Sequence, residues 1–376
     1  MRAYGPLAAS SLGLPTGPRR EPYPAGFFAS GLVRPDGRAP GCAVEISRVA
    51  IGVAKRKHDE IGDKMMTSMI EETTTQNVLQ PVDLARPRIQ PNPIVRLEDI
   101  SLGEPMAYRG ITLVPLFLPQ LGNFRYLSLS DALEQNTLKV NEMSLEGVVP
   151  ELIVENSGHL PVLLMNGEEL LGLKQNRVLN TSMLVPARTQ MPIPVSCVEQ
   201  GRWENSGSNK TSAGHMLEHT IRTRQMDAVN WSLESNGTFR SDQDDIWHGL
   251  WQLIHKAGTY SAHGAMRDVY QQKRIKLNRH CKAFPVQTGQ QGLLVLHENK
   301  PLGFDLVSRP EIYRQNHCKL VKSYVLDSLL EKPRRAISPS RASTIAGEFL
   351  IQANEVKPKR FASPGSVVLC RQMQTA

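Results

Sequence analysis

Polar residues of the types needed for chemistry gather in residues 166–177 (NGEELLGLKQNR), and the run continues to Asn180. Paired carboxylates can act as general acid and general base, and Lys or Arg side chains can hold phosphate or carboxylate groups. Two glycines in the run allow the backbone to approach a ligand closely. The pattern indicates a small-ligand site, although a solvated turn with cross-strand ion pairs accounts for it equally well. The candidate catalytic residues are Glu168 and Glu169, and the candidate ligand contacts are Lys174, Gln175, Asn176, Arg177 and Asn180.

A second polar cluster, residues 196–203 (SCVEQGRW), stands at the end of an apolar stretch. An Arg beside a Trp can pair with and stack on a planar anionic group such as a nucleotide. We therefore add Arg202 and Trp203 to the ligand contacts and Glu199 to the catalytic candidates. Cys197 lies within the apolar stretch and is more typical of a small core residue, because a nucleophilic thiol needs a nearby base and a lowered pKa.

A third cluster, residues 240–245 (RSDQDD), precedes a helical pattern. Acidic and hydroxyl side chains favour the first turn of a helix because they cap free backbone N–H groups and complement the helix dipole. This preference fully accounts for Asp244 and Asp245. Asp242 and Gln243 stay candidate ligand contacts.

Metal and nucleotide motifs are weak or missing. His215 and His219 have the i, i+4 spacing of zinc ligands, but the residues between them do not give a His-Glu-x-x-His pattern, and a surface helix explains the pair better. The sequence has no Walker A loop, no Gly-x-Gly-x-x-Gly after a strand, no Gly-x-Ser-x-Gly elbow and no Cys-x-x-Cys. We therefore predict no metal site, and the cofactor stays unknown.

Short apolar segments separated by turns predict an antiparallel, β-rich first half of the main domain. Segments at this spacing are typical of a sandwich or a barrel-like sheet. The segments are residues 111–118, 138–142, 151–155, 162–165, 177–185 and 193–198, with a short helix at 128–134.

The second half shows helical periodicity. Trp247, Leu250, Trp251 and Ile254 recur at i, i+3, i+4 and i+7, which predicts a helix over 244–256 with both tryptophans in the core. Strands first and helices later indicate an α+β fold with a single main domain. A flexible loop, a common origin of lids, is predicted at 205–214. Further helices are predicted at 265–282 and 310–330, and a hairpin at 292–297 and 301–307.

The net charge of +8 lies mainly at the ends of the chain: residues 1–64 carry +4, 65–104 carry −3, 105–330 carry +2 and 331–376 carry +5. Pro and Gly interrupt the first 64 residues too often for regular structure. We predict a disordered extension and linker, in part an over-extended start, at 1–104, the main domain at 105–331, and a basic flexible tail at 332–376. Because the folded middle is nearly neutral, nucleic-acid binding is disfavoured.

No apolar run approaches the ~18 to 20 residues that span a bilayer, which excludes a membrane-spanning protein. The five cysteines, at 42, 197, 281, 318 and 370, are scattered. Scattered cysteines favour a reducing compartment. We therefore expect a cytoplasmic protein.

Five blocks of the sequence together resemble a bacterial domain family, the ARG and rhodanese-phosphatase-superfamily-associated protein domain. The blocks are PVLLMNGEEL, KQNRVLN, IPVSCVEQGRW, SDQDDIW and LVKSYVLDSL. The family name records an association with ADP-ribosylglycohydrolase and rhodanese-phosphatase proteins, so the resemblance implies a place near NAD or ADP-ribose metabolism and no established reaction. The family's polar motif residues coincide with the candidates named above.

We expect the domain to bind or process an ADP-ribose-like or other phosphorylated nucleotide metabolite, and whether it is an enzyme stays open. Lys174, Arg177 and Arg202 would hold phosphates, and Trp203 would stack on a base or ribose. The alternative is a non-enzymatic binding or scaffold module whose polar motifs are structural or form a partner interface. Convergence of the candidates on one open pocket favours the first hypothesis, and pairing within the sheet under a closed surface favours the second.

Overall fold

Most strands precede residue 216 and most helices follow it, in the part of the chain that the structure describes. The structure is a computed structural model that describes residues 27–30, 97–119, 124–144, 147–204, 212–331, 335, 337–355 and 370–373, with the backbone alone for 27–30, 212 and 370–373. The strand-then-helix order confirms the α+β prediction.

In chain order the elements are β1 (Phe27–Ser30), the 3-10 helix η1 (Leu97–Asp99), β2 (Ser101–Leu102), β3 (Met106–Tyr108), β4 (Ile111–Phe117), β5 (Leu127–Ser128), α1 (Leu129–Glu134), β6 (Leu138–Glu142), β7 (Glu151–Asn156), β8 (Val162–Leu164), β9 (Glu168–Leu171), β10 (Arg177–Leu179), β11 (Met183–Val185), β12 (Thr189–Cys197), β13 (Ser212–Met216), α2 (His219–Asn236), α3 (Gln243–Ala257), α4 (Met266–Gln272), α5 (Arg274–Ala283), β14 (Gly292–His297), β15 (Lys300–Leu306), α6 (Pro310–Ser328), α7 (Pro339–Glu355) and β16 (Cys370–Met373).

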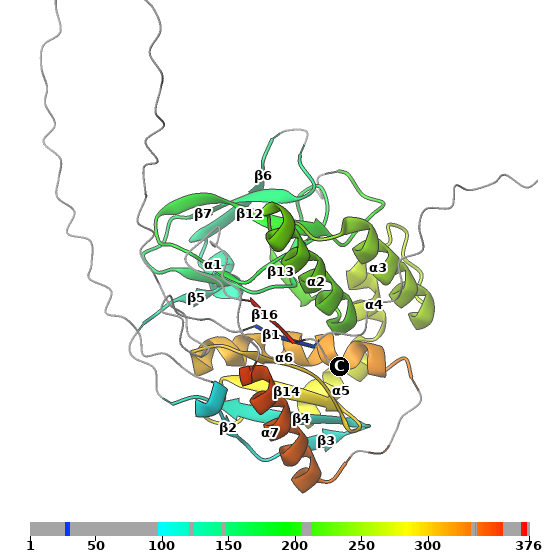
Figure 1. The fold of residues 1–376 in the computed structure, drawn as a ribbon. Coiled ribbons are helices and arrows are strands. Elements are labelled where there is room, and N and C mark those ends of the chain that lie inside the picture. The colour runs from blue at the N-terminus through cyan, green and yellow to red at the C-terminus, as the bar shows by residue number, and fades with distance from the viewer. Residues whose placement is uncertain are drawn as a thin grey trace, which may run out of the picture.

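Two apolar strands, β4 and β14, lie in the middle of the largest sheet, which runs in the order β16-β1-β15-β14-β4-β2 with β3 also paired to β4. They are antiparallel, with Leu294 opposite Val114. Val114 and Leu116 of β4 belong to the core under α7, and Ile111 and Leu113 belong to the core on the opposite face. Figure 1 shows α7 across one face, with α5 and α6 on the other. Because both faces are covered, these strands show no polar alternation.

A second group of strands forms the predicted antiparallel, sandwich-like part. Its six-stranded sheet has the order β13-β9-β10-β12-β7-β6, and a three-stranded sheet has the order β11-β8-β5. Apolar side chains from both sheets share one core with the short helix α1. The hydroxyl of Ser128 accepts from Asp131 N at 3.1 Å and caps α1, as its sequence predicts.

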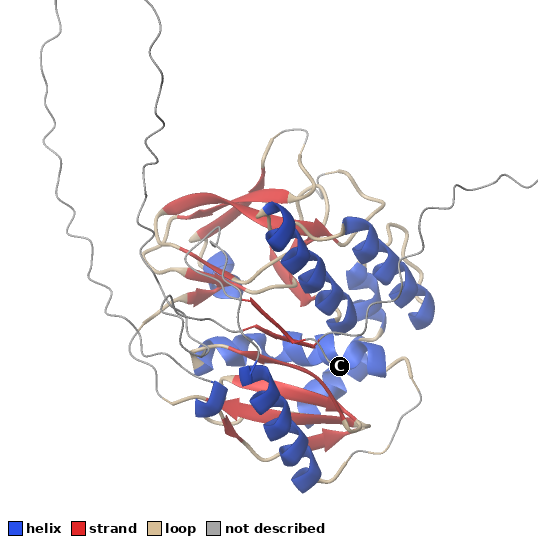
Figure 2. Ribbon diagram, viewed as in Figure 1, coloured by secondary structure: helices blue, strands red, loops and turns tan. Residues whose placement is uncertain are grey.

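The helices after residue 218 connect the two groups of strands. Figure 2 shows them between and beside the sheets, and α6 contacts β13 on one side and β14 on the other. A buried ion pair crosses the same junction, where Arg222 Nη2 of α2 lies 2.7 Å from Asp305 Oδ2 of β15. The sheet that carries the polar motifs is thereby fixed against the rest of the domain.

Two elements predicted as continuous are divided. The strand predicted over 177–185 separates into β10 and β11, which belong to different sheets. Buried Asn180 lies at the break, and its side chain makes hydrogen bonds to three other segments: β12, Phe239 and α2. The helix predicted over 265–282 separates into α4 and α5 at Lys273, whose ψ of 3° departs from helical geometry.

The structure corrects the prediction that both tryptophans of α3 lie in the core. The buried face of α3 consists of Ile246, Gly249, Leu250, Leu253 and Ala257, and Trp251 is 63% exposed. The buried stripe of α3 lies one position before the stripe that the two tryptophans indicate.

The chain ends also differ from the predicted boundaries. Within the predicted tail, α7 packs on the central sheet with Phe349 only 3% exposed. Within the predicted linker, Leu97 is buried against the same core and β2 pairs with β4. Two predicted segments lie largely outside the described residues: residues 1–96, of which only β1 is described, and residues 205–211 of the predicted loop. The end of that loop, from residue 212, forms part of β13.

Among the described residues, no helix is long and apolar enough to cross a membrane.

Candidate functional site

Strand pairing brings the two main polar motifs together. Arg177 of β10 lies opposite Leu170 of β9 on one side and opposite Cys197 of β12 on the other. The chain reverses between β9 and β10 through positive φ at Gly172 (102°) and Leu173 (57°). The motif residues from 168 to 180 and from 196 to 203 therefore lie side by side in the six-stranded sheet.

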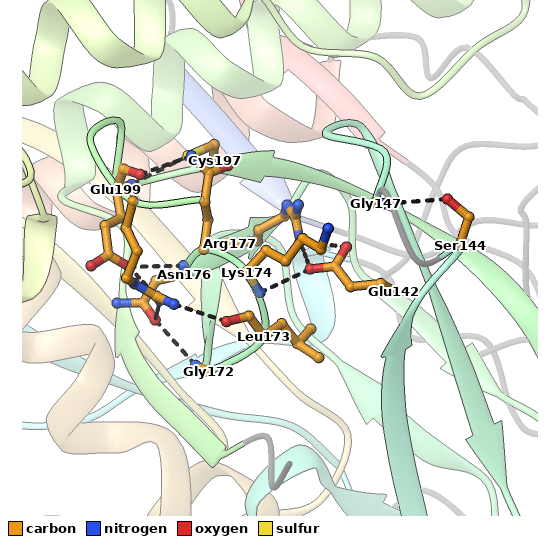
Figure 3. A network of polar contacts seen from close by, with 12 residues as sticks. Glu142, Ser144, Gly147, Gly172, Leu173, Lys174, Asn176, Arg177, Cys197 and Glu199 are labelled. Atoms are coloured by element: carbon orange, nitrogen blue, oxygen red, sulfur yellow. Dashed lines mark hydrogen bonds and ion pairs between the residues drawn. The ribbon is translucent and has the colours of Figure 1, made fainter. Parts of the chain in front are cut away.

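Arg177 is fully buried and forms an ion pair with Glu142 at the end of β6. Its Nη1 donates to both carboxylate oxygens, at 3.1 and 3.2 Å. Glu142 Oε1 also accepts from the backbone N–H of Lys174 at 3.0 Å. The Nε and Nη2 of Arg177 have no hydrogen-bond partner among the described residues. Figure 3 shows Glu142 on one side of Arg177 and Asn176 with Glu199 on the other.

Glu199 and Arg202 form a second pair. Arg202 Nη2 donates to Glu199 Oε2 at 2.6 Å and to Asn176 Oδ1 at 3.2 Å, and Nη1 donates to two backbone carbonyls, including that of Leu173. Glu199 Oε2 also accepts from Asn176 N, and its carbonyl accepts from Gln175 Nε2. Both guanidinium nitrogens that carry these bonds are therefore committed to groups of the protein itself.

Trp203 is the exposed member of the cluster. Its side chain is 42% exposed, and the ring centroid lies 5.6 Å from Lys174 Nζ and 5.7 Å from Arg177 Cζ, within the range of cation–π contacts. A Cβ added to Gly147 would lie 3.1 Å from the Lys174 side chain and 3.3 Å from the Trp203 ring. We call Gly147, Lys174, Arg202 and Trp203 the Trp203 rim.

The two carboxylates of β9 point to different partners. Glu168 Oε1 accepts from Lys319 Nζ of α6 at 2.7 Å, and the same ammonium donates to Ser130 at 3.0 Å. Glu169 Oε2 accepts from His215 N at 2.9 Å, while its Oε1 has no partner among the described residues. Burial raises the pKa of Glu169 to about 7, against the smaller effects of the His215 bond and the charge of Arg267.

His215 lies in an irregular part of β13, where the pairing with β9 shifts register. Its ring stacks on Tyr270 with centroids 4.3 Å apart. Burial, followed by the charges of Lys322, Arg267 and Lys319, lowers the pKa of His215 to about 4. At neutral pH this ring is uncharged and lies among three cations.

The remaining candidates join the sheet to the helices. Asn180 accepts from Ser196 Oγ at 2.5 Å and from Gln225 Nε2 of α2 at 3.0 Å. Gln243 of α3 makes two hydrogen bonds to the backbone of Cys197, at 2.8 and 2.9 Å. Exposed Asp242 caps α3 by accepting from Asp245 N. These contacts are structural, and those of Asp242 lie apart from the network.

Cys197 and the histidine pair do not have the surroundings of reactive groups. Burial raises the pKa of the Cys197 thiol. His215 lies on a strand and His219 begins α2, so the two do not share the predicted surface helix. No group of three or more His, Cys, Asp or Glu side chains able to hold a metal occurs in the described part of the chain. A cavity of about 20 Å³ lies beside Asn166, Arg222 and Asp305, enough for about one water and too small for a nucleotide.

Seven candidates of the first two clusters share one network of contacts, namely Lys174, Gln175, Asn176, Arg177, Glu199, Arg202 and Trp203. Glu168, Glu169 and Asn180 instead contact α6, β13 and α2. The structure also adds residues that sequence reasoning missed. Glu142 lies 35 positions from Arg177 along the chain, and Lys319 lies 151 positions from Glu168. Arg267 and His215 join them from α4 and β13. No local spacing indicates partners this distant. Of these residues, His215 alone has a sequence signal, its i, i+4 spacing from His219.

Fold and site together define a class: an α+β domain in which a buried polar network connects the central strands of a sheet to the helices around it. A family model described as ARG and Rhodanese-Phosphatase-superfamily-associated Protein domain matches residues 99–374. The chain belongs to this family, as its sequence blocks predict. Comparisons with curated proteins and with solved structures find no match.

Proposed function

We propose that this chain binds a small phosphorylated nucleotide metabolite of the ADP-ribose type at the Trp203 rim. The observation that carries the proposal is the 42% exposed Trp203 ring with the Lys174 ammonium 5.6 Å from its centroid. No carboxylate of the described residues pairs with that ammonium. An indole surface can stack on a base, and an ammonium beside it can bind a phosphate.

In this proposal Arg202 of the rim and the motif residues outside it hold Lys174 and Trp203 in position. A phosphate at Arg202 would have to replace Glu199 and two backbone carbonyls, and a phosphate at Arg177 would have to enter a closed interior. Both arginines are therefore assigned to positioning the turn that carries Lys174 and the segment that carries Trp203. The association recorded in the family name supports the ADP-ribose class of ligand.

The ion pairing and burial of the three candidate carboxylates favour ligand binding over catalysis. Glu168 and Glu199 are held in ion pairs. Glu169 has a pKa of about 7, suited to proton transfer at neutral pH, but it is buried beneath β13, where a Cβ on Gly214 would lie 2.3 Å from its Oε2. Acid–base chemistry at Glu169 would require β13 to move away.

The second candidate function is a non-enzymatic scaffold module whose polar motifs are purely structural. The pairing of Arg177 with Glu142 and of Arg202 with Glu199 inside the sheet favours it. The two candidates differ in one property, because the scaffold requires no small ligand at the Trp203 rim.

Calorimetric titration of the full chain with ADP-ribose, NAD, AMP, ribose 5-phosphate and adenosine separates the two functions. We expect ADP-ribose to bind, AMP to bind more weakly, and adenosine and ribose 5-phosphate to bind least, since each of the last two lacks either the phosphate or the base. Replacing Lys174 by Gln should weaken ADP-ribose binding at least tenfold, or about 1.4 kcal/mol. Absence of heat with every compound overturns the proposal and leaves the scaffold.

A further inference from the structure

Two cysteines outside the polar network lie against each other on neighbouring helices. Cys281 is near the end of α5 and Cys318 is in the middle of α6, and the two helices pack together (Figure 1). Cys281 Sγ donates to the carbonyl oxygen of Cys318 at 3.7 Å, and the two thiols lie close enough for each to affect the pKa of the other. Cys318 is exposed and Cys281 is half-buried.

The pair is chemically asymmetric. The interaction with the Cys281 thiol, with the charge of Lys322 one turn along α6, lowers the pKa of Cys318. The same interaction raises the pKa of Cys281. A thiol that has a lowered pKa and is exposed to solvent is the more nucleophilic member of such a pair. Cys197 has neither property, because it is buried and its pKa is raised.

We propose that Cys318 and Cys281 are a hydroperoxide-oxidisable dithiol site that forms a reversible disulfide between α5 and α6. The Cys318 thiolate attacks one oxygen of hydrogen peroxide; the O–O bond breaks, hydroxide leaves and is protonated to water, and Cys318 becomes a sulfenic acid. The Cys281 sulfur then attacks the Cys318 sulfur. The S–O bond breaks, the S–S bond forms, and a second water leaves with the proton of Cys281. The two thiols supply the two electrons that reduce the peroxide, and a small dithiol or glutathione then reduces the disulfide back to the two thiols by thiol–disulfide exchange.

The site lies next to the polar network. Lys319, the residue after Cys318, holds Glu168 through its ammonium at 2.7 Å. A disulfide at Cys318 would link α5 covalently to the turn of α6 from which Lys319 contacts β9. The inference does not depend on the ligand proposed for the Trp203 rim.

The test oxidises the full chain with dilute hydrogen peroxide at pH 7 and measures intact mass and non-reduced peptides. We expect a loss of about 2 Da for the two hydrogens of one disulfide, a peptide linked through Cys281 and Cys318, and full reversal by dithiothreitol. In Cys281→Ser the linked peptide should vanish, and a dimedone adduct should mark a sulfenic acid at Cys318.

The matched control is Cys42→Ser/Cys370→Ser, which should form the same disulfide at the same rate. Oxidation of Cys318 to sulfinic acid without a link to Cys281 in the unaltered chain would overturn the proposal. So would a link that joins either residue to another cysteine. Circular dichroism of Cys281→Ser confirms that a missing link does not come from unfolding.

Discussion

Arg177 shows at the scale of a single residue what the polar motif does in this fold. Its guanidinium is buried with one carboxylate partner, Glu142, and a ring contact to Trp203. Removing one member of a buried ion pair leaves the other charge uncompensated. We predict that Arg177→Met lowers the free energy of unfolding by about 3 to 5 kcal/mol, measured by urea denaturation.

Two further variants make this measurement specific. Lys256→Met breaks an exposed pair with Asp327, whose side chains are 41% and 39% exposed, and should cost about 0 to 1 kcal/mol. The double variant Glu142→Leu/Arg177→Met should recover most of the lost stability, because no lone charge is left. A loss below about 1 kcal/mol for Arg177→Met would indicate that the guanidinium is kept for a ligand instead of the fold.

Glu169 gives a pH-dependent prediction at the same scale. Burial raises its pKa from 4.5 to about 7 in the folded chain, so the folded state binds more protons than the unfolded state between these values. The contribution of Glu169 to stability is greatest below pH 4.5 and is lost as pH rises through 7. Glu169→Gln removes this dependence, because the amide stays neutral and can still accept from His215 N.

The measured quantity is the unfolding free energy of Glu169→Gln minus that of the unaltered chain, at pH 5 and pH 8. The lowered pKa values of His215 and His219 make stability rise with pH. Both proteins contain these histidines, so their contribution cancels in the difference. We expect the difference to shift in favour of Glu169→Gln by roughly 2 to 3 kcal/mol between the two pH values. A difference that stays constant contradicts a neutral buried Glu169.

At the scale of elements, α7 decides where the domain ends. Phe349 is 3% exposed and meets Phe304 of β15 edge to face, with centroids 6.2 Å apart. Phe349→Ala should lower the free energy of unfolding by about 3 to 5 kcal/mol. Ile351→Ala in the same helix, at a side chain 63% exposed, should have little effect. Equal stability of the two variants would mean that α7 does not belong to the folded domain.

Elements with a strong hydrophobic periodicity were predictable from the sequence, and elements with a weak one were not. β4, the β14–β15 hairpin and α6 have apolar runs or stripes that leave few alternatives. α7 carried a usable signal, since its buried residues Ala342, Ile345, Ala346, Phe349, Leu350 and Ala353 follow helical spacing after Ser338 and Pro339. The signal is weak because three of these residues are alanines, which have small side chains. The basic, proline-containing segments on either side of α7 are typical of a flexible tail.

The sequence indicated which segments carry the candidate residues but not what each of these residues contacts. The polar residues of two sequence segments do meet, as β10 pairs with β12. Whether each faces a ligand or an internal partner depended on Glu142, His215 and Lys319, which lie far away in the sequence. Such partners are set by the packing of the complete fold, and no pattern within a single segment encodes them.

At the scale of the whole molecule, the net charge of +8 has little bearing on the proposed ligand. The predicted middle of the chain carries +2, and three cations of its polar motifs and their surroundings, Arg177, Arg202 and Lys319, are paired with carboxylates. Lys174 beside Trp203 is the local exception. A single small anion suits this arrangement better than a polyanion, which needs an extended basic surface.

Calorimetric titration of ADP-ribose into Trp203→Ala and Trp231→Ala, beside the unaltered chain, tests this account most directly. Trp231 is 67% exposed on α2 and serves as the matched control for loss of an exposed indole. We predict that Trp203→Ala lowers ADP-ribose affinity by at least tenfold, about 1.4 kcal/mol, while Trp231→Ala binds as the unaltered chain does. Equal affinity of both variants, or no binding by the unaltered chain, would contradict a nucleotide site at the Trp203 rim.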